Sequence, residues 1–242
     1  MSDSDPSTLI PAATVILVRA RATVEVLMVK RDSKLAFAGG HWVFPGGRVD
    51  AADYPPNEVE LDDLARLGAA EVAAAVREAA EEAGLVIEPT ALRRWSHWTP
   101  PDAGQPRRFS TAFFIAPAPD GEVVVDDVEI RDHQWVSPER ALVLQRAEQI
   151  ELTPPTYITL TQLEGATTVD ELLARADGVV EHFATRIGAL EGELVALYHG
   201  DAGYVDGDAG RAGPRHRLRM APGSWRYERD PSIAPGTPVT TG

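Results

Sequence analysis

Three glutamates are crowded into five residues near the middle of the chain, in the segment AAVREAAEEAGL (residues 74–85). Glu78, Glu81 and Glu82 stand at positions i, i+3 and i+4, so they share one face if the segment is helical. Like charges at this spacing weaken a helix by about 0.2–0.5 kcal/mol per pair. The crowding therefore needs a physical explanation.

Two explanations are open. A charged face that only meets solvent is the first, because most charge runs mark simple exposure. A divalent cation is the second, because Mg²⁺ prefers oxygen ligands and shares its coordination sphere with water and substrate phosphates. Small alanines around the acids, Arg77 four residues before Glu81, and Gly84 directly after the segment favour the cation. The bound ion would neutralise a diphosphate and activate a water molecule.

The elements that position these acids are predicted from hydrophobic patterns and turn residues. We expect a helix over residues 64–83 that ends at Gly84, and a second helix that begins after Ser137 as its N-cap. Strands are expected at residues 12–20, 24–30, 42–47, 92–98, 107–116 and 130–136, with shorter ones from residue 85 and over 122–127. The first two strands are expected to pair. Beyond residue 152 we expect helices over 153–165 and 168–190, a strand over 193–200 and a terminal hairpin over 216–229. This order predicts an α+β fold with a mixed sheet flanked by helices.

Composition narrows the function classes. The chain has 242 residues, a net charge of −14 and 44% hydrophobic residues. So acidic a chain is a poor duplex nucleic-acid binder, and without an apolar run of about 18 residues we expect no membrane partner. The acidic, polar start lacks the features of a secretory signal, and cysteine is absent. We therefore expect a cytoplasmic protein without thiolate catalysis or cysteine-based metal sites.

The segment REAAEEAGL resembles the end of the Nudix box, G-x5-E-x7-R-E-U-x-E-E-x-G-U, in which U is aliphatic. FPGG (residues 44–47) resembles the stretch that opens the box. The spacing between them departs from the pattern, because counting back from Arg77 places the early glutamate at Ala69. The segment 48–63 therefore reads as an insertion after Gly47, and Glu71 and Asp53 are the candidates for the early acid.

The insertion is similar to that of one branch of the Nudix superfamily, the proteins related to peroxisomal coenzyme A diphosphatases. VFPGGRVDAAD, TPPDAGQPRRFSTAFFIA, WVSPERAL and PPTYITLTQL carry this resemblance, which spans residues 12–165. It implies a Nudix-type α/β/α sandwich over residues 11–150, with the insertion loop at 48–63, a helical and hairpin extension over 151–230, and flexible tails at 1–10 and 231–242.

The resemblance also implies an activity. The expected protein is a Mg²⁺- or Mn²⁺-dependent hydrolase that cleaves the diphosphate bond of a nucleoside-diphosphate-linked small molecule, first of all coenzyme A or acyl-CoA. ADP-ribose, NADH or another nucleotide diphosphate is the alternative substrate, and a non-catalytic binding module is the alternative function. A homodimer is expected on the same grounds.

Site residues follow from the resemblance. Glu78, Glu81 and Glu82, with the carbonyl of Gly47 or its neighbour Gly46, are expected to hold metal. Glu82 is the first choice as a base, Glu129 is the alternative, and Arg77 is expected to orient the catalytic acids rather than react. The candidates for substrate binding are Lys30, Arg31, Arg107, Arg108 and Phe109, with Trp98 and Phe113 as further stacking candidates.

Overall fold

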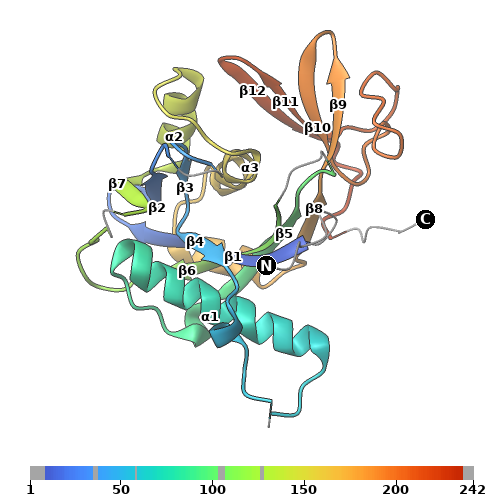
Figure 1. The fold of residues 1–242 in the computed structure, drawn as a ribbon. Coiled ribbons are helices and arrows are strands. Elements are labelled where there is room, and N and C mark those ends of the chain that lie inside the picture. The colour runs from blue at the N-terminus through green and yellow to red at the C-terminus, as the bar shows by residue number, and fades with distance from the viewer. Residues whose placement is uncertain (1–8, 35–37, 58, 103–106, 126–127, 237–242) are drawn as a thin grey trace.

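The structure is a computed structural model of the chain, and it describes residues 9–34, 38–57, 59–102, 107–125 and 128–236 (Figure 1). The expected tails overlap with residues 1–8 and 237–242, which lie outside these ranges. In the described part of the chain, no helix combines the length and apolar composition needed to span a bilayer.

Eight strands form a mixed main sheet. They are β1 (Leu9–Ala20), β2 (Val24–Arg31), β3 (Trp42–Val43), β4 (Gly46–Arg48), β5 (Arg93–Thr99), β6 (Arg108–Pro117), β7 (Ile130–Val136) and β8 (Glu181–Ala184). The main order is β3-β2-β1-β6-β5-β8, with β4 paired to β1 and β7 paired to β2. The pairs β1–β6 and β5–β8 are parallel and the other pairs are antiparallel.

Helix α1 (Asp63–Ala83) covers one face of this sheet (Figure 1). Its N-terminus is capped by the Asp62 carboxylate, which accepts a hydrogen bond from the Ala65 N–H. Gly84 ends the helix in the left-handed conformation, at φ 67°, as the sequence predicts. Buried alanines 74, 75, 79 and 83 pack against β1 and β6, and their small size lets the helix lie close to the sheet.

Helices α2 (Pro138–Arg146), α3 (Pro154–Leu163) and α4 (Val169–Ala176) pack on the opposite face. Ser137 caps α2 as predicted, because its hydroxyl accepts a hydrogen bond from the Arg140 N–H. Helices therefore cover both faces of the mixed sheet (Figure 1), and the expected α/β/α sandwich is confirmed.

A second, four-stranded antiparallel sheet follows the main one. It contains β9 (Arg186–Leu190), β10 (Glu193–Leu197), β11 (His216–Ala221) and β12 (Ser224–Arg229), and the predicted terminal hairpin is its β11–β12 pair. Arg217 and Asp201, both buried, form two hydrogen bonds of 2.7 and 2.6 Å that fix the long β10–β11 connection. Trp98 of β5 stacks on Phe183 of β8, with ring centroids 4.0 Å apart, and both rings contact Tyr198, which follows β10, so this cluster joins the second sheet to the core.

Four secondary-structure predictions differ from the structure. The helix expected over 168–190 stops at Ala176, and β8 and β9 follow, because Asp177 and Gly178 end the helix and β-branched residues come next. The strand expected from residue 85 is irregular backbone that leads into the short 3₁₀ helix Pro89–Ala91. Residues 122–125 form no strand, and the rest of that prediction, residues 126–127, lies outside the described residues. The strand expected at 42–47 is two strands, β3 and β4, separated by Phe44 and Pro45.

Candidate active site

The three crowded glutamates lie in the last turns of α1. Partial negative charge from the carbonyl groups gathers at a helix C-terminus, so this is the less favourable end for carboxylates. No Lys or Arg is present in the last turn to offset them. Glu82 is 4% exposed, whereas the Glu81 side chain is 60% exposed. The acids therefore form a ridge, which we call the α1 acid ridge (Glu78, Glu81 and Glu82), that runs from the interior to the surface.

Glu82 is the buried member of the α1 acid ridge. Its carboxylate accepts a 2.9 Å hydrogen bond from the Gly46 N–H at the start of β4. Burial raises the pKa of Glu82 to about 8, and the nearby charges of Glu78 and Glu129 add to the rise. The Gly46 N–H and the Arg31 guanidinium act in the opposite direction without cancelling the effect of burial. A nearby cation favours the ionised form of a carboxylate, so it would offset the cost of burying the Glu82 charge.

Glu78 lies directly against Gly47. A Cβ atom at Gly47 would come within 2.3 Å of a Glu78 carboxylate oxygen, so the glycine leaves space that the carboxylate fills. Burial also raises the pKa of Glu78, and Arg77 partly counteracts it. The FPGG stretch and the α1 acid ridge are thus two halves of one site.

Arg77 links the ridge to the insertion loop. Its guanidinium donates to Glu78 at 2.8 Å, to Glu81 at 2.9 Å and to both carboxylate oxygens of Asp53 at 3.0 and 2.9 Å. Hydrogen bonds to these acids raise the pKa of Arg77, so it stays charged. Glu71, the other candidate for the early acid, instead pairs with Arg94. Asp53, at the end of the 3₁₀ helix Ala51–Asp53, is therefore the acid that contacts the arginine of the box.

Arg31, at the end of β2, stands between two acids. One guanidinium nitrogen lies 3.6 Å from Glu82, and another lies 3.3 Å from Glu129. The Glu129 side chain is 53% exposed, so its carboxylate meets water. In the described ranges, no three Asp, Glu or His side chains converge closely enough to enclose an ion in this conformation. The acids contact arginines instead.

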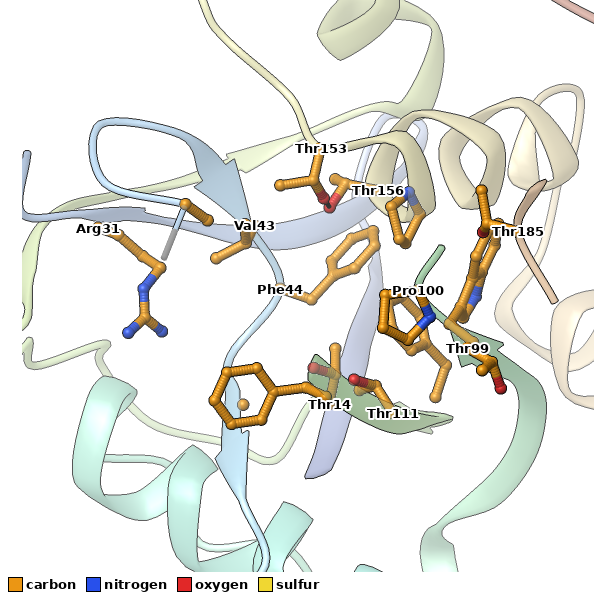
Figure 2. A pocket seen from close by; sticks show the side chains of 16 residues that line it. Thr14, Arg31, Val43, Phe44, Thr99, Pro100, Thr111, Thr153, Thr156 and Thr185 are labelled. Carbon is orange, nitrogen blue, oxygen red and sulfur yellow. Dashed lines mark hydrogen bonds between the residues drawn. The ribbon is translucent and has the colours of Figure 1, made fainter. Parts of the chain in front are cut away.

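A pocket of about 140 Å³ opens beside Gly46 and Arg31 (Figure 2). Aromatic and threonine side chains dominate its wall: Phe44, Trp98, Phe109, Phe113, Thr14, Thr99, Thr111, Thr153, Thr156 and Thr185. An apolar cavity of about 150 Å³ accepts a benzene-sized ring, so this pocket suits a flat ring or a narrow chain. A second cavity of about 490 Å³ shares Thr99, Pro100 and Thr185 with it and is also lined by Arg108 and Arg186.

Some of the residues expected to bind substrate line one of the two cavities, and others line neither. Arg31 and Phe109 line the pocket, and Arg108 lines the second cavity while donating a hydrogen bond to the Pro100 carbonyl at 3.1 Å. Lys30 and Arg107 line neither cavity. The threonine wall was not predicted, because its members come from separate strands and from the start of α3, and no local motif connects them.

A model of the NUDIX domain matches residues 8–155, more than half of the chain. The chain is a member of the Nudix family. The resemblance seen in the box is therefore confirmed, and the α1 acid ridge lies in the matched part.

Curated relatives agree with this assignment. The chain is 28% identical over 189 residues to a putative nudix hydrolase 7 from Caenorhabditis elegans, with 63% of this chain and 60% of the relative covered. It is 25% identical over 234 residues to the acyl-coenzyme A diphosphatase NUDT19 of Xenopus laevis (61% and 62% covered) and 32% identical over 122 residues to that of Homo sapiens (48% and 32%). This Nudix chain thus spans less than two thirds of the length of these relatives. The two diphosphatases agree with the branch to which the insertion is similar.

A solved structure shares the fold. The NUDIX hydrolase from Alicyclobacillus acidocaldarius matches with a TM-score of 0.59 and 23% sequence identity, over 69% of this chain and 96% of that one. At this identity the match supports the Nudix fold alone.

Proposed function

We propose that this Nudix chain is a hydrolase that uses Mg²⁺ or Mn²⁺ to cleave the diphosphate bond of a nucleoside-diphosphate-linked small molecule. The observation that carries the proposal is the buried Glu82 carboxylate, held by the Gly46 N–H at the C-terminal end of α1 and next to a pocket. The α1 acid ridge and the Gly47 carbonyl are the oxygen donors that would hold the cation. Hard carboxylate and carbonyl oxygens fit Mg²⁺ and Mn²⁺, and the space left by Gly47 keeps Glu78 in reach.

The bound cation would supply charge neutralisation for the diphosphate and a more acidic water. The water oxygen forms a bond to one phosphorus, and the bond from that phosphorus to the bridging oxygen breaks. The bridging oxygen leaves with the other phosphate. We assign the water proton to Glu129, the alternative base, and the half-exposed carboxylate of Glu129 and the hydrogen bond from the Gly46 N–H to Glu82 support this choice. No covalent intermediate with the protein is required.

Coenzyme A or acyl-CoA is the substrate that we favour. Such a molecule carries a flat base on one side of the diphosphate and a long, narrow arm on the other. The pocket suits a ring or a narrow chain, and the adjoining cavity has room for more of the molecule, with Arg108 and Arg186 in its wall to meet phosphate. The names of two relatives point to the same substrate class.

A panel of diphosphates tests the proposal. The purified chain is incubated with coenzyme A, an acyl-CoA, ADP-ribose or NADH, with Mg²⁺, Mn²⁺ or EDTA, and the products are identified by mass spectrometry. We expect metal-dependent release of 4′-phosphopantetheine and adenosine 3′,5′-bisphosphate from coenzyme A, and ¹⁸O-labelled water identifies the attacked phosphorus. If ADP-ribose or NADH released AMP with a higher kcat/KM than coenzyme A shows, the preferred substrate would belong to the alternative class. Absence of turnover with every compound would favour a binding module.

Residence in the cytosol and assembly as a homodimer stay predictions from the sequence. Size-exclusion chromatography with light scattering measures the second directly.

A further inference from the structure

Arg31 and Arg77 neutralise the acids of the site in different ways. Arg77 contacts Glu78 and Glu81, but it is also anchored outside the ridge by Asp53 and by the Arg48 carbonyl at 3.0 Å. Arg31 contacts Glu82 and Glu129, and its distance of 3.6 Å to Glu82 exceeds that of a hydrogen bond. Arg77 is thus fixed to the fold, whereas the Arg31 guanidinium is held mainly by charge.

The contacts of the Arg31 backbone and Nε allow its guanidinium group to move. Its backbone is fixed, because the N–H donates to the His41 carbonyl at 3.1 Å and the carbonyl accepts from the Gly40 N–H at 3.0 Å. Its Nε is buried and has no hydrogen-bond partner among the described residues. The side chain lines the pocket, and Figure 2 shows it with Val43 on one side, opposite Thr99 and Thr185. The guanidinium can therefore leave the acids with the loss of one 3.3 Å hydrogen bond and one 3.6 Å ion pair, and without disturbing the strand.

We propose that Arg31 is a positioning residue that neutralises Glu82 and Glu129 in the metal-free protein, in place of the divalent cation that the α1 acid ridge would hold. When the cation binds, the guanidinium is displaced into the pocket, where its unpaired donors face the substrate diphosphate. This inference rests on the metal site of the proposed function. It assigns to Arg31 two alternating partners, the carboxylates before metal binding and the phosphates after it, because the cation and the guanidinium repel each other at short distance.

The proposal predicts competition between Arg31 and the metal. Mn²⁺ is titrated into the 242-residue chain, and free Mn²⁺ is measured by electron paramagnetic resonance without substrate. Arg31→Gln is expected to lower the Kd for Mn²⁺ by about tenfold or more, because a competing charge is removed beside the site. Arg48→Gln is the matched control: Arg48 pairs with Asp50 at 2.7 Å on the exposed side of β4, so its loss is expected to change the Kd by less than about twofold.

Unchanged or weaker Mn²⁺ binding in Arg31→Gln, with binding intact in the wild type, would overturn the role of Arg31 and leave the proposed function standing. If neither protein binds Mn²⁺, the metal site and the inference fail together.

A measurement on the wild type avoids any folding defect of the variant. The Nε–H signal of Arg31, assigned by its disappearance in Arg31→Lys, is followed by NMR during a Mg²⁺ titration. We expect this signal to shift with the same midpoint as Mg²⁺ binding, while the Nε–H signal of Arg77, donated to Asp53, moves little. A static Arg31 signal at saturating Mg²⁺ would contradict the displacement.

Discussion

Asp53 and Arg77 are joined by two parallel hydrogen bonds, of 3.0 and 2.9 Å, that link the insertion loop to the α1 acid ridge. The Asp53 side chain is 5% exposed, and its carboxylate also accepts a 2.8 Å hydrogen bond from the Asp50 N–H. Burial opposes ionisation of Asp53, but the hydrogen bonds from Arg77 and Asp50 prevail and lower its pKa. The loop between FPGG and α1 thus supplies an acid that contacts Arg77, and we expect this contact to orient the arginine.

Asp53→Asn tests this support. The amide replaces one acceptor oxygen with a donor that faces the Arg77 guanidinium, so Arg77 should lose its fixed position. We expect the metal-dependent kcat/KM to fall by about 10- to 100-fold, the range typical of groups that orient metal ligands. Glu71→Gln is the control, because this buried acid pairs with Arg94 and should change stability but not turnover. Equal turnover in Asp53→Asn and wild type would show that the loop does not orient the site.

Glu82→Gln should separate catalysis from folding. The amide keeps an oxygen that can accept from the Gly46 N–H but loses the charge that a metal requires. We expect turnover to fall by at least about 100-fold, while the melting temperature stays equal or rises because an unfavourable buried charge is removed. Turnover and melting are measured on the same preparation. Full activity in this variant would remove Glu82 from the site.

The two glycines of the FPGG stretch are expected to respond differently to alanine. At Gly46 the new Cβ would lie 2.4 Å from the Ala13 carbonyl oxygen and 2.7 Å from the Thr14 Cα, so the backbone must move. We expect Gly46→Ala to cost about 1–3 kcal/mol of stability. At Gly47 the three atoms nearest to the Cβ belong to the Glu78 carboxylate, the end of a side chain that can turn away, so Gly47→Ala should fold normally and bind Mn²⁺ at least about tenfold more weakly. Urea unfolding and Mn²⁺ titration distinguish the two variants. Equal losses of stability and of Mn²⁺ affinity in both variants would contradict the different roles given to the two glycines.

Acid should destabilise the protein through His216. Burial lowers the pKa of this imidazole from 6.5 to about 4, outweighing the hydrogen bond to the His199 carbonyl that favours its charged form. The unfolded chain therefore binds a proton between pH 6.5 and 4 that the folded chain does not, and stability falls as the pH falls through this window. The loss from this residue is about 3 kcal/mol.

His216→Gln should flatten that dependence. The free energy of urea unfolding is measured for both proteins from pH 7.5 to 4.5, and the variant should show the smaller slope. Burial also lowers the pKa of His97 to about 4, so some slope of the same sign remains. Identical slopes in the two proteins would show that His216 is protonated equally in both states.

The site was partly predictable from sequence, for a physical reason. The acids of the α1 acid ridge are local in the chain, and helical spacing alone places them on one face. The early acid of the box could only be narrowed to Asp53 or Glu71, because the choice depends on how an irregular loop folds back. Glu129 and Arg31 come together through the pairing of β2 with β7, which no local pattern encodes.

The fold, like the site, could be predicted only where the pattern is local in the sequence. Alanine content and Gly84 were enough to predict α1, and β-branched runs were enough to predict β1 and β2. Residues 177–190 were predicted as helix because their short apolar stretches fit either period. Strand β8 forms because an edge of β5 is available, and β9 forms because it pairs with β10, and both pairings are properties of the tertiary structure.

Strand β8 has a consequence for where this protein can be cut. Residues 8–155 match the family model, yet β8 lies beyond them, hydrogen-bonds along β5 and places Phe183 on Trp98. A chain shortened at residue 155 would leave a row of unsatisfied amides and carbonyls beside an uncovered indole, a surface that recruits other strands and aggregates. We therefore expect the smallest unit that folds alone to be larger than the family signature, and shortened versions intended for crystallisation should retain β8.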